Sequence, residues 1–358
     1  MSLPVLMAVL LALYVLSALL LQHFALKGLV CTRSFATPAV FEGEESEMIE
    51  IVRNDRPMII PWLRVESGVS PYIRLGRQEN LSVSDHTHYC SLFMLMPYQQ
   101  IRRRHKVRFL RRGAYNLGNA SLTAGDLFGF AEAHREQAMS VPVLVYPRLL
   151  DERELPRPLE QLMNETVAQR RLAQDPFLIR GIRPYQIGDP VRDIHWPATA
   201  RTGQAQIRLH DYSAQSRLLV VLNVQRTDNQ WGDRLMEAEE AAIEHEISMA
   251  ATLCVRALQN GFSAGFAANM PIGEDTACAF VAPAAGSAAQ EHLLAAFARL
   301  RLRRTLSFTT FLQQLGEHTG LDMLILSCYD SDEIQAAMKM LRSRGNQAAL
   351  YLVKEGGA

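Results

Sequence analysis

The sequence predicts a multidomain α+β protein: an N-terminal transmembrane helix, an antiparallel β-sandwich, and an α/β domain with a mostly parallel sheet. Three observations predict it: an uncharged apolar run at the N-terminus, short strands separated by turn residues, and strands alternating with helices in the C-terminal part. The 358 residues suffice for two or three domains. We expect an anchor at 1–28, a sandwich of immunoglobulin-like size at 29–150, a linker at 151–176, and the α/β region with its preceding segment at 177–358.

Composition excludes some classes of protein. The charges of the 37 basic and 37 acidic residues cancel, which excludes capture of nucleic acid by the overall charge of the chain. Binding of nucleic acid by a local basic patch is not excluded. Five scattered cysteines without a C-x-x-C pair exclude a disulfide scaffold and a zinc ribbon or finger. Composition says nothing about catalysis.

The first predicted element is the apolar run at 3–21. At 1.5 Å per residue it is long enough to cross a hydrocarbon layer of about 30 Å. A cleaved signal peptide is the alternative, but it lacks a positive n-region and a clear small-residue cleavage site. Lys27 and Arg33 follow the run, so the positive-inside rule places the body in the cytoplasm, in agreement with the unpaired cysteines. The predicted location is a cytoplasmic membrane crossed once.

The sandwich is predicted from strand-like runs at 48–52, 62–65, 91–95 and 141–146, bounded by Gly, Asn, Asp and Pro. Short strands without a strong helical stretch are typical of an antiparallel sandwich. After it, Pro156 and Pro158 interrupt regular structure, and 159–172 has the pattern of a polar helix, which we interpret as a connector.

The α/β domain begins with the apolar run at 218–222, typical of a parallel strand covered on both faces. An amphipathic helix is predicted at about 233–259, with acidic first turns and an Asn-Gly stop. Further strands are predicted at 263–268, 277–281, 323–328 and 348–353, with helices at 289–303, 308–318 and 332–344. This alternation predicts a doubly wound, mostly parallel sheet.

The segment 177–203 contains R-x-Y-x-x-G-D-x-x-R-x-I-x-W followed by A-R. It resembles the bacterial family catalogued as domain of unknown function 58, as do the stretches at 112–118, 126–129 and 145–148. The matching positions are Arg183, Tyr185, Gly188, Asp189, Arg192, Ile194, Trp196, Ala200 and Arg201.

The resemblance implies a membrane-anchored bacterial protein with a β-rich region before the signature and a von Willebrand factor A-like domain at its end. Genes of this family commonly neighbour those of MoxR-type AAA+ ATPases, which implies an adaptor or assembly role, and no enzymatic activity is established for the family. It also implies the bacterial inner membrane as the location. This chain departs from the family in offering one predicted span where a pair is common.

Type A domains bind a divalent cation through a D-x-S-x-S motif at the end of their first strand. By the resemblance, residues 223–227 occupy the place of this motif. The corresponding positions here form a degenerate cation site at Asn223, Gln225, Thr227 and Asp330. Because the first carboxylate is lost, we predict no metal and no cofactor, with Mg²⁺ or Ca²⁺ as the alternative. His86, His88 and Cys90 alternate along a predicted strand, but their spacing matches no established zinc site, so a polar sheet face is preferred.

The signature allows two interpretations. In the first, His195 transfers protons and Asp189 orients it, as in a cell-envelope hydrolase. In the second, the segment is structural or docks a partner: Asp189 pairs with an arginine and Trp196 packs into the core. Turn-forming Gly188-Asp189-Pro190 and the lack of a neighbouring Ser or Cys nucleophile favour the second. Its candidate residues are Arg183, Tyr185, Gly188, Asp189, Arg192, His195, Trp196 and Arg201.

A basic patch is predicted where Arg102, Arg104, Lys106 and Arg108 share one face of an extended strand. A charged edge strand that prevents aggregation is preferred over contact with acidic lipid, and nucleic acid is the least favoured. The sequence has no phosphate-binding loop. We therefore expect a membrane-anchored, non-enzymatic adaptor that binds membrane lipid through its N-terminal helix and also binds protein partners. The family resemblance alone implies that a MoxR-type ATPase is one of these partners. Any ATP would be used by the partner.

Overall fold

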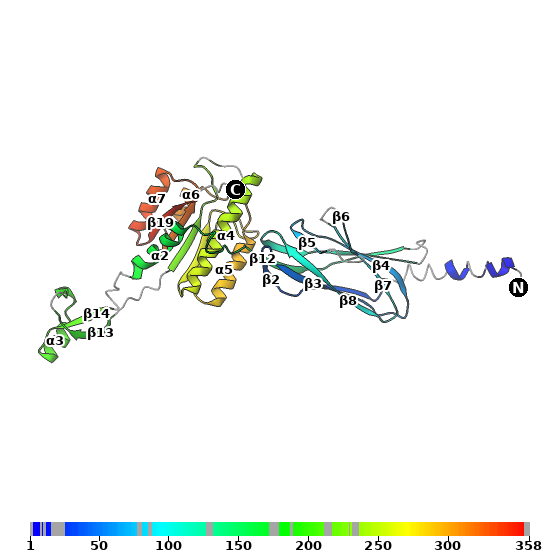
Figure 1. Cartoon of the computed structure of the whole chain (residues 1–358), viewed down its shortest axis with the longest axis horizontal. Helices are drawn as coiled ribbons and strands as arrows, with labels where there is room; N and C mark the ends of the chain where they lie inside the picture. The colour runs from blue at the N-terminus through cyan, green and yellow to red at the C-terminus, as the bar shows by residue number, and fades with distance from the viewer. Residues whose placement is uncertain are drawn as a thin grey trace. The chain divides into compact units, whose positions relative to one another are not determined.

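The structure is a computed structural model, and it describes residues 3–7, 9, 12–15, 26–76, 81–84, 88–126, 132–171, 179–186, 189–210, 217–228, 230 and 236–353. The chain divides into two compact units, Met1–Arg148 and Leu149–Ala358 (Figure 1). The first is built from β-strands and the second from strands and helices. The protein is thus multidomain and α+β.

The first unit contains three sheets. A five-stranded sheet has the order β11-β10-β4-β7-β6, a four-stranded sheet β1-β3-β8-β5, and a three-stranded sheet β2-β12-β9. All pairs are antiparallel except β12 with β2. The strands are β1 (Leu29–Phe35), β2 (Ala39–Phe41), β3 (Glu45–Asn54), β4 (Ile60–Gly68), β5 (Ile73–Leu75), β6 (Leu81–Ser84), β7 (His88–Leu95), β8 (Gln100–Phe109), β9 (Gly113–Leu117), β10 (Ala120–Gly125), β11 (Glu132–Gln137) and β12 (Val141–Tyr146).

Alternating side chains form the core of this unit. In β4, Leu63 and Val65 point inward and pack with Cys31 and Val52 of the four-stranded sheet, so the two sheets lie face to face. A second cluster, which includes Phe109 and Val143, extends the core to the three-stranded sheet. The alternate positions of β4 point outward and are partly or fully exposed.

A charged network lies inside this sandwich. The Glu50 carboxylate, fully buried, accepts hydrogen bonds from Arg33 Nε at 2.8 Å and from the Tyr89 hydroxyl at 2.7 Å. The ring Nε2 of His105 lies 3.4 Å from the same carboxylate, and Arg33 also donates to Ser67. Buried charges are tolerated only when they are paired and hydrogen-bonded, as these are.

The second unit has a five-stranded sheet with the order β17-β16-β15-β18-β19, parallel except for the antiparallel edge strand β17. Apolar clusters show that helices α2, α4 and α5 cover one face and α6 and α7 the other (Figure 1). The elements are α2 (Arg157–Arg171), β15 (Arg217–Leu222), α4 (Glu237–Gln259), β16 (Ser263–Ala268), β17 (Ala279–Ala284), α5 (Ser287–Arg299), α6 (Phe308–Leu315), β18 (Asp322–Ser327), α7 (Asp332–Ser343) and β19 (Gln347–Leu352).

Helix α2 lies within the segment predicted as a linker. Its Leu159 and Met163, together with Leu155 before it, are buried in the α/β core. Their spacing of four residues places them on one helix face, which covers β18 and β19. The beginning of this segment is therefore part of the second unit.

The prediction of an N-terminal transmembrane helix is wrong. Within the described part of the chain, no helix is long and apolar enough to cross a membrane. A helix that crosses a membrane needs about 20 consecutive apolar residues. Residues 8, 10, 11 and 16–21 of the predicted span lie outside the described residues. The expected anchor at 1–28 and the single-pass inner-membrane location with a cytoplasmic body are withdrawn with it.

Candidate functional site

The family signature forms a small hairpin of its own, made by β13 (Ile179–Pro184) and β14 (Gln206–His210), which pair antiparallel. Between them lie a 3₁₀ turn, η1 (Val191–Asp193), and the helix α3 (Trp196–Thr202). We call residues 179–210 the signature hairpin (Figure 1).

The Asp189 carboxylate is the central acceptor of the hairpin. It binds Arg183 through two parallel hydrogen bonds of 2.8 and 2.7 Å and also accepts the backbone N–H of Gln186 at 2.8 Å. The Arg183 hydrogen bond, and after it the Gln186 bond, lower the pKa of Asp189. This confirms the predicted pairing with an arginine and makes Asp189 a fixed carboxylate rather than a proton donor.

His195 caps helix α3. Its ring Nδ1 accepts the N–H of Ala198 at 3.0 Å, so the neutral ring carries its proton on Nε2. Its backbone N–H donates to Gln206 at 2.8 Å, and Gly203 ends the helix with φ at 68°. Among the described residues, no hydrogen bond joins His195 to Asp189; the Asp189 carboxylate bonds to Arg183 and Gln186 and the His195 ring to Ala198.

The described residues of the hairpin carry few hydroxyl or thiol groups. The hairpin contains no Ser or Cys. The Thr199 hydroxyl accepts the Gln206 N–H, and the Thr202 hydroxyl lies in hydrogen-bond contact with two backbone carbonyls. Within residues 179–186 and 189–210, every hydroxyl other than that of Tyr185 serves the local fold.

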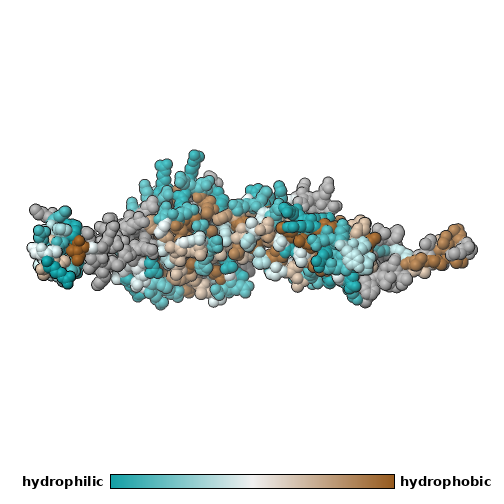
Figure 2. Space-filling view, turned by 90° about the horizontal axis from the view of Figure 1, so that it is seen from below, coloured by the Kyte–Doolittle hydropathy of each residue, from teal (hydrophilic) through white to brown (hydrophobic). Residues whose placement is uncertain are grey.

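The exposed side chains of the hairpin are apolar and basic. Trp196 is 67% exposed, Val191 65% and Ile182 45%. The prediction that Trp196 packs into the core is therefore wrong. Arg192, with its side chain 83% exposed, and Arg201 share this exposure, and apolar surface is visible on the hairpin in Figure 2. Tyr185 is half-buried, and Gly188 lies outside the described residues.

The degenerate cation site lies where β15 ends. Asn223 is fully buried; its amide donates to Ser327 at 2.9 Å and its oxygen accepts the N–H of Gln225 at 3.0 Å. Gln225 in turn accepts the N–H of Phe308 at 2.6 Å. The amide oxygens that a cation would need are thus bonded to the protein itself.

Two ion pairs stand beside these amides. Arg226 binds Glu246 of α4 at 2.5 Å, and Arg304 binds Glu239 at 3.3 Å. Burial lowers the pKa of Arg226, but the Glu246 carboxylate outweighs burial and the net shift is upward. A fixed guanidinium here repels a divalent cation.

One comparison with known proteins matches part of the second unit to a family. The family described as "Protein of unknown function DUF58" matches residues 181–355. We call these residues the DUF58 segment. The resemblance predicted from the signature is confirmed to that extent.

The remaining comparisons add no function. No curated protein matches the chain. Among solved structures, the CARDB domain of a Pyrococcus furiosus protein has 17% identity and a TM-score of 0.22, over 33% of this chain and 90% of that one. A non-cellulosomal cohesin from Archaeoglobus fulgidus has 8% identity and a TM-score of 0.24, over 32% and 90%. Scores this low carry no argument about the chain.

Two further positions belong to the degenerate cation site, at which we predicted no metal. In the DUF58 segment, Thr227 is exposed and both Asp330 oxygens accept hydrogen bonds from Gln335. Across the described residues, no group of three or more His, Cys, Asp or Glu side chains could hold a metal ion. Of the proposed zinc trio, His86 and the side chain of His88 lie outside the described residues.

The basic patch, before the DUF58 segment, is placed on β8. Arg102, Arg104, Lys106 and Arg108 are exposed on the outer face of the four-stranded sheet. Strand β8 pairs with β3 over most of its length and with β5 at one end, so it is not the simple edge strand that we preferred from the sequence. Glu47 lies 3.5 Å from Arg104 and neutralises part of the patch.

The sequence did not reveal the ion pairs of the DUF58 segment. Arg304 and Glu239 are far apart in the chain and meet only because α4 packs beside the sheet. The sequence shows acidic residues in the first turn of α4, but the helix dipole alone accounts for acidic residues at that end of a helix.

Proposed function

We propose that this protein is a non-enzymatic adaptor that docks a protein partner through the signature hairpin. The observation that carries the proposal is the exposure of Trp196 on a hairpin braced by hydrogen bonds. Trp and Arg are the residue types that most often dominate binding energy at protein interfaces. Trp196 beside exposed Arg192 and Arg201 fits that composition.

The hairpin is organised before it meets a partner. The two hydrogen bonds between Arg183 and Asp189 fix the turn after β13, and the His195 cap fixes the first turn of α3. A surface already ordered loses less conformational entropy on binding. This favours docking over a solvated loop without a role.

The charge of the hairpin indicates the chemistry of the partner. Residues 179–210 hold five arginines and two aspartates, a net charge of five minus two, or +3, in a chain whose overall charge is zero. An acidic surface with an apolar pocket for Trp196 would complement it. Family resemblance supplies the candidate, a MoxR-type AAA+ ATPase, and no observation favours the alternative cell-envelope hydrolase.

The test is binding of the full chain to a purified MoxR-type ATPase from the same genome. Trp196→Ala should weaken binding about 30-fold, the cost of a hot-spot residue of about 2 kcal/mol. Leu352→Ala, a truncation of another exposed apolar side chain, is the matched control and should have no effect. Equal binding by the wild type, Trp196→Ala and Arg192→Ala would refute docking through this hairpin.

A further inference from the structure

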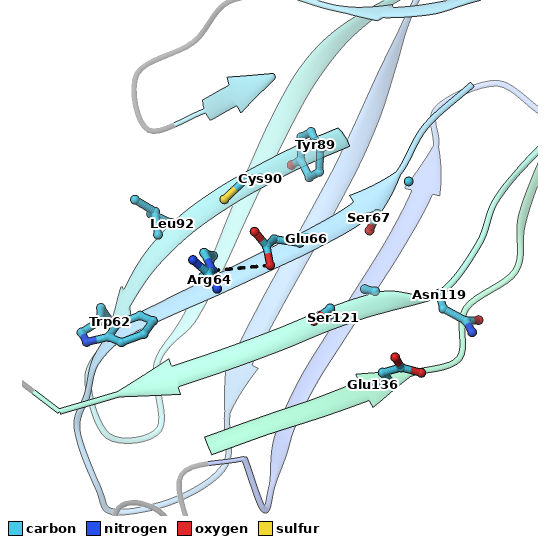
Figure 3. A pocket seen from close by; sticks show the side chains of 12 residues that line it. Trp62, Arg64, Glu66, Ser67, Tyr89, Cys90, Leu92, Asn119, Ser121 and Glu136 are labelled. Carbon is cyan, nitrogen blue, oxygen red and sulfur yellow. Dashed lines mark ion pairs between the residues drawn. The ribbon is translucent and has the colours of Figure 1, made fainter. Parts of the chain in front are cut away.

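A groove of about 780 Å³ lies on the outer face of the five-stranded sheet, apart from the signature hairpin. Its lining comes from β4, β7, β10 and β11 and the turn before β10 (Figure 3). Strand β4 pairs with β7 on one side and β10 on the other, so the middle of the floor offers no free strand edge. An occupant that lies over these central strands is recognised by side chains, because a peptide adds a strand only at a sheet edge.

One end of the groove is an aromatic platform. Trp62 of β4 lies directly opposite Gly125 of β10, and a Cβ on Gly125 would come within 2.1 Å of the Trp62 ring. Only glycine lets the ring lie against the neighbouring strand. The indole N–H donates to the Asp126 carbonyl at 2.8 Å and pins the ring, which lines the groove.

The other end is a row of polar groups. The strand register places Glu136, Ser121 and Glu66 side by side on β11, β10 and β4 (Figure 3). Strands lie about 4.8 Å apart, so the two carboxylates flank a small serine at about 10 Å from each other. Arg64 follows on the same face of β4, 3.4 Å from Glu66.

We propose that this groove binds a neutral or amino-sugar oligosaccharide. A sugar ring has an apolar C–H face, which packs on the fixed indole face, and a rim of hydroxyls, which donate to carboxylates and accept from a guanidinium. Two carboxylates against one guanidinium disfavour an acidic polymer. Trp62 and Glu66 are four residues apart on one strand, about 13 Å, so a ligand that reaches both needs several linked rings.

The experiment is calorimetric titration of the full chain with cellohexaose, chitohexaose and an oligogalacturonate. One of the two uncharged hexamers should bind. The disaccharide built from the same sugar should bind at least tenfold more weakly, and the acidic oligomer should not bind. Trp62→Ala should weaken the hexamer at least tenfold. Glu136→Gln removes an exposed charge without touching the core and should weaken binding of the hexamer severalfold. This second variant still tests the proposal if the Trp62→Ala protein does not fold.

Trp196→Ala is the matched control, because it removes an exposed tryptophan from the other unit. It should leave sugar binding unchanged while it reduces capture of the ATPase, so the two proposals fail separately. The saccharide proposal is overturned if neither uncharged hexamer binds, if the acidic oligomer binds as well, or if Trp62→Ala and Glu136→Gln leave the affinity unchanged. It is equally overturned if a peptide or a second copy of the chain occupies the groove.

Discussion

Glu50 is the carboxylate shared by Arg33, Tyr89 and His105 in the interior of the β-sandwich. Replacing it with glutamine keeps the shape of the side chain and removes its charge, which leaves the Arg33 guanidinium buried at 1% side-chain exposure without a counterion. Breaking a buried pair in this way costs about 3–5 kcal/mol. We therefore expect Glu50→Gln to lower the free energy of unfolding of the first unit by about that amount, measured by urea denaturation.

The control is the double variant Arg33→Met with Glu50→Leu. It removes both charges and fills the space with apolar atoms, which is often neutral or stabilising. The double variant should thus be more stable than Glu50→Gln alone. If the single variant costs less than about 1 kcal/mol, or if both variants cost the same, the reasoning about an uncompensated buried charge is refuted.

The same carboxylate predicts how stability depends on pH. Burial raises the pKa of Glu50, but hydrogen bonds from His105, Tyr89 and Arg33 and the charge of Arg33 outweigh it and lower the pKa from 4.5 to about 2. Because the folded pKa is depressed, the stabilisation is complete above pH 4.5 and is lost as pH falls toward 2. A shift of this size corresponds to about 3 kcal/mol, and Glu50→Leu in the Arg33→Met background should remove this part of the acid sensitivity.

Three further predictions concern single substitutions and metal. Gly125→Ala should destabilise the first unit by about 1–3 kcal/mol through its clash with the Trp62 ring, whereas Gly118→Ala, whose Cβ meets nothing within 4 Å, should cost much less; thermal melts compare them. Arg183→Ala should speed amide exchange in the signature hairpin by breaking its carboxylate bond, and Arg192→Ala, an exposed arginine, should not. Adding millimolar Mg²⁺ or Ca²⁺ should leave the melting temperature unchanged, and an upward shift would contradict the closed amide network at the end of β15.

The α/β sheet was predictable because its strands are covered on both faces. A central strand that helices cover on both faces has apolar side chains at every position, as residues 218–222 do. A helix was predicted at 159–172, but as a polar connector, although Leu155, Leu159 and Met163 repeat every four residues and lie in the core. The prediction began this helix after the two prolines, whereas α2 begins at Arg157, and proline is well tolerated in the first turn of a helix.

Other features depend on pairing that sequence spacing does not encode. Trp62 and Gly125 meet only through the register between β4 and β10, so the groove has no sequence signature. Trp196 was placed in the core because aromatic side chains usually are buried, but its surroundings follow from where the hairpin turns. The N-terminal run is apolar enough to predict a span, but no helix of the described residues is long and apolar enough to cross a membrane.

The end of β15 explains why recognition is proposed elsewhere in the molecule. Strand β15 lies between β16 and β18, so the order of the strands reverses at this strand. Open parallel sheets usually bind ligands in the crevice at the carboxyl ends of the strands where the order reverses. In this protein Asn223, Gln225 and Asn269 close that crevice with hydrogen bonds to Ser327, Phe308 and Val224. We infer that the sheet edge serves as scaffold. The signature hairpin is inserted in the chain between α2 and β15, so the partner docking that we propose for it involves no strand of this sheet.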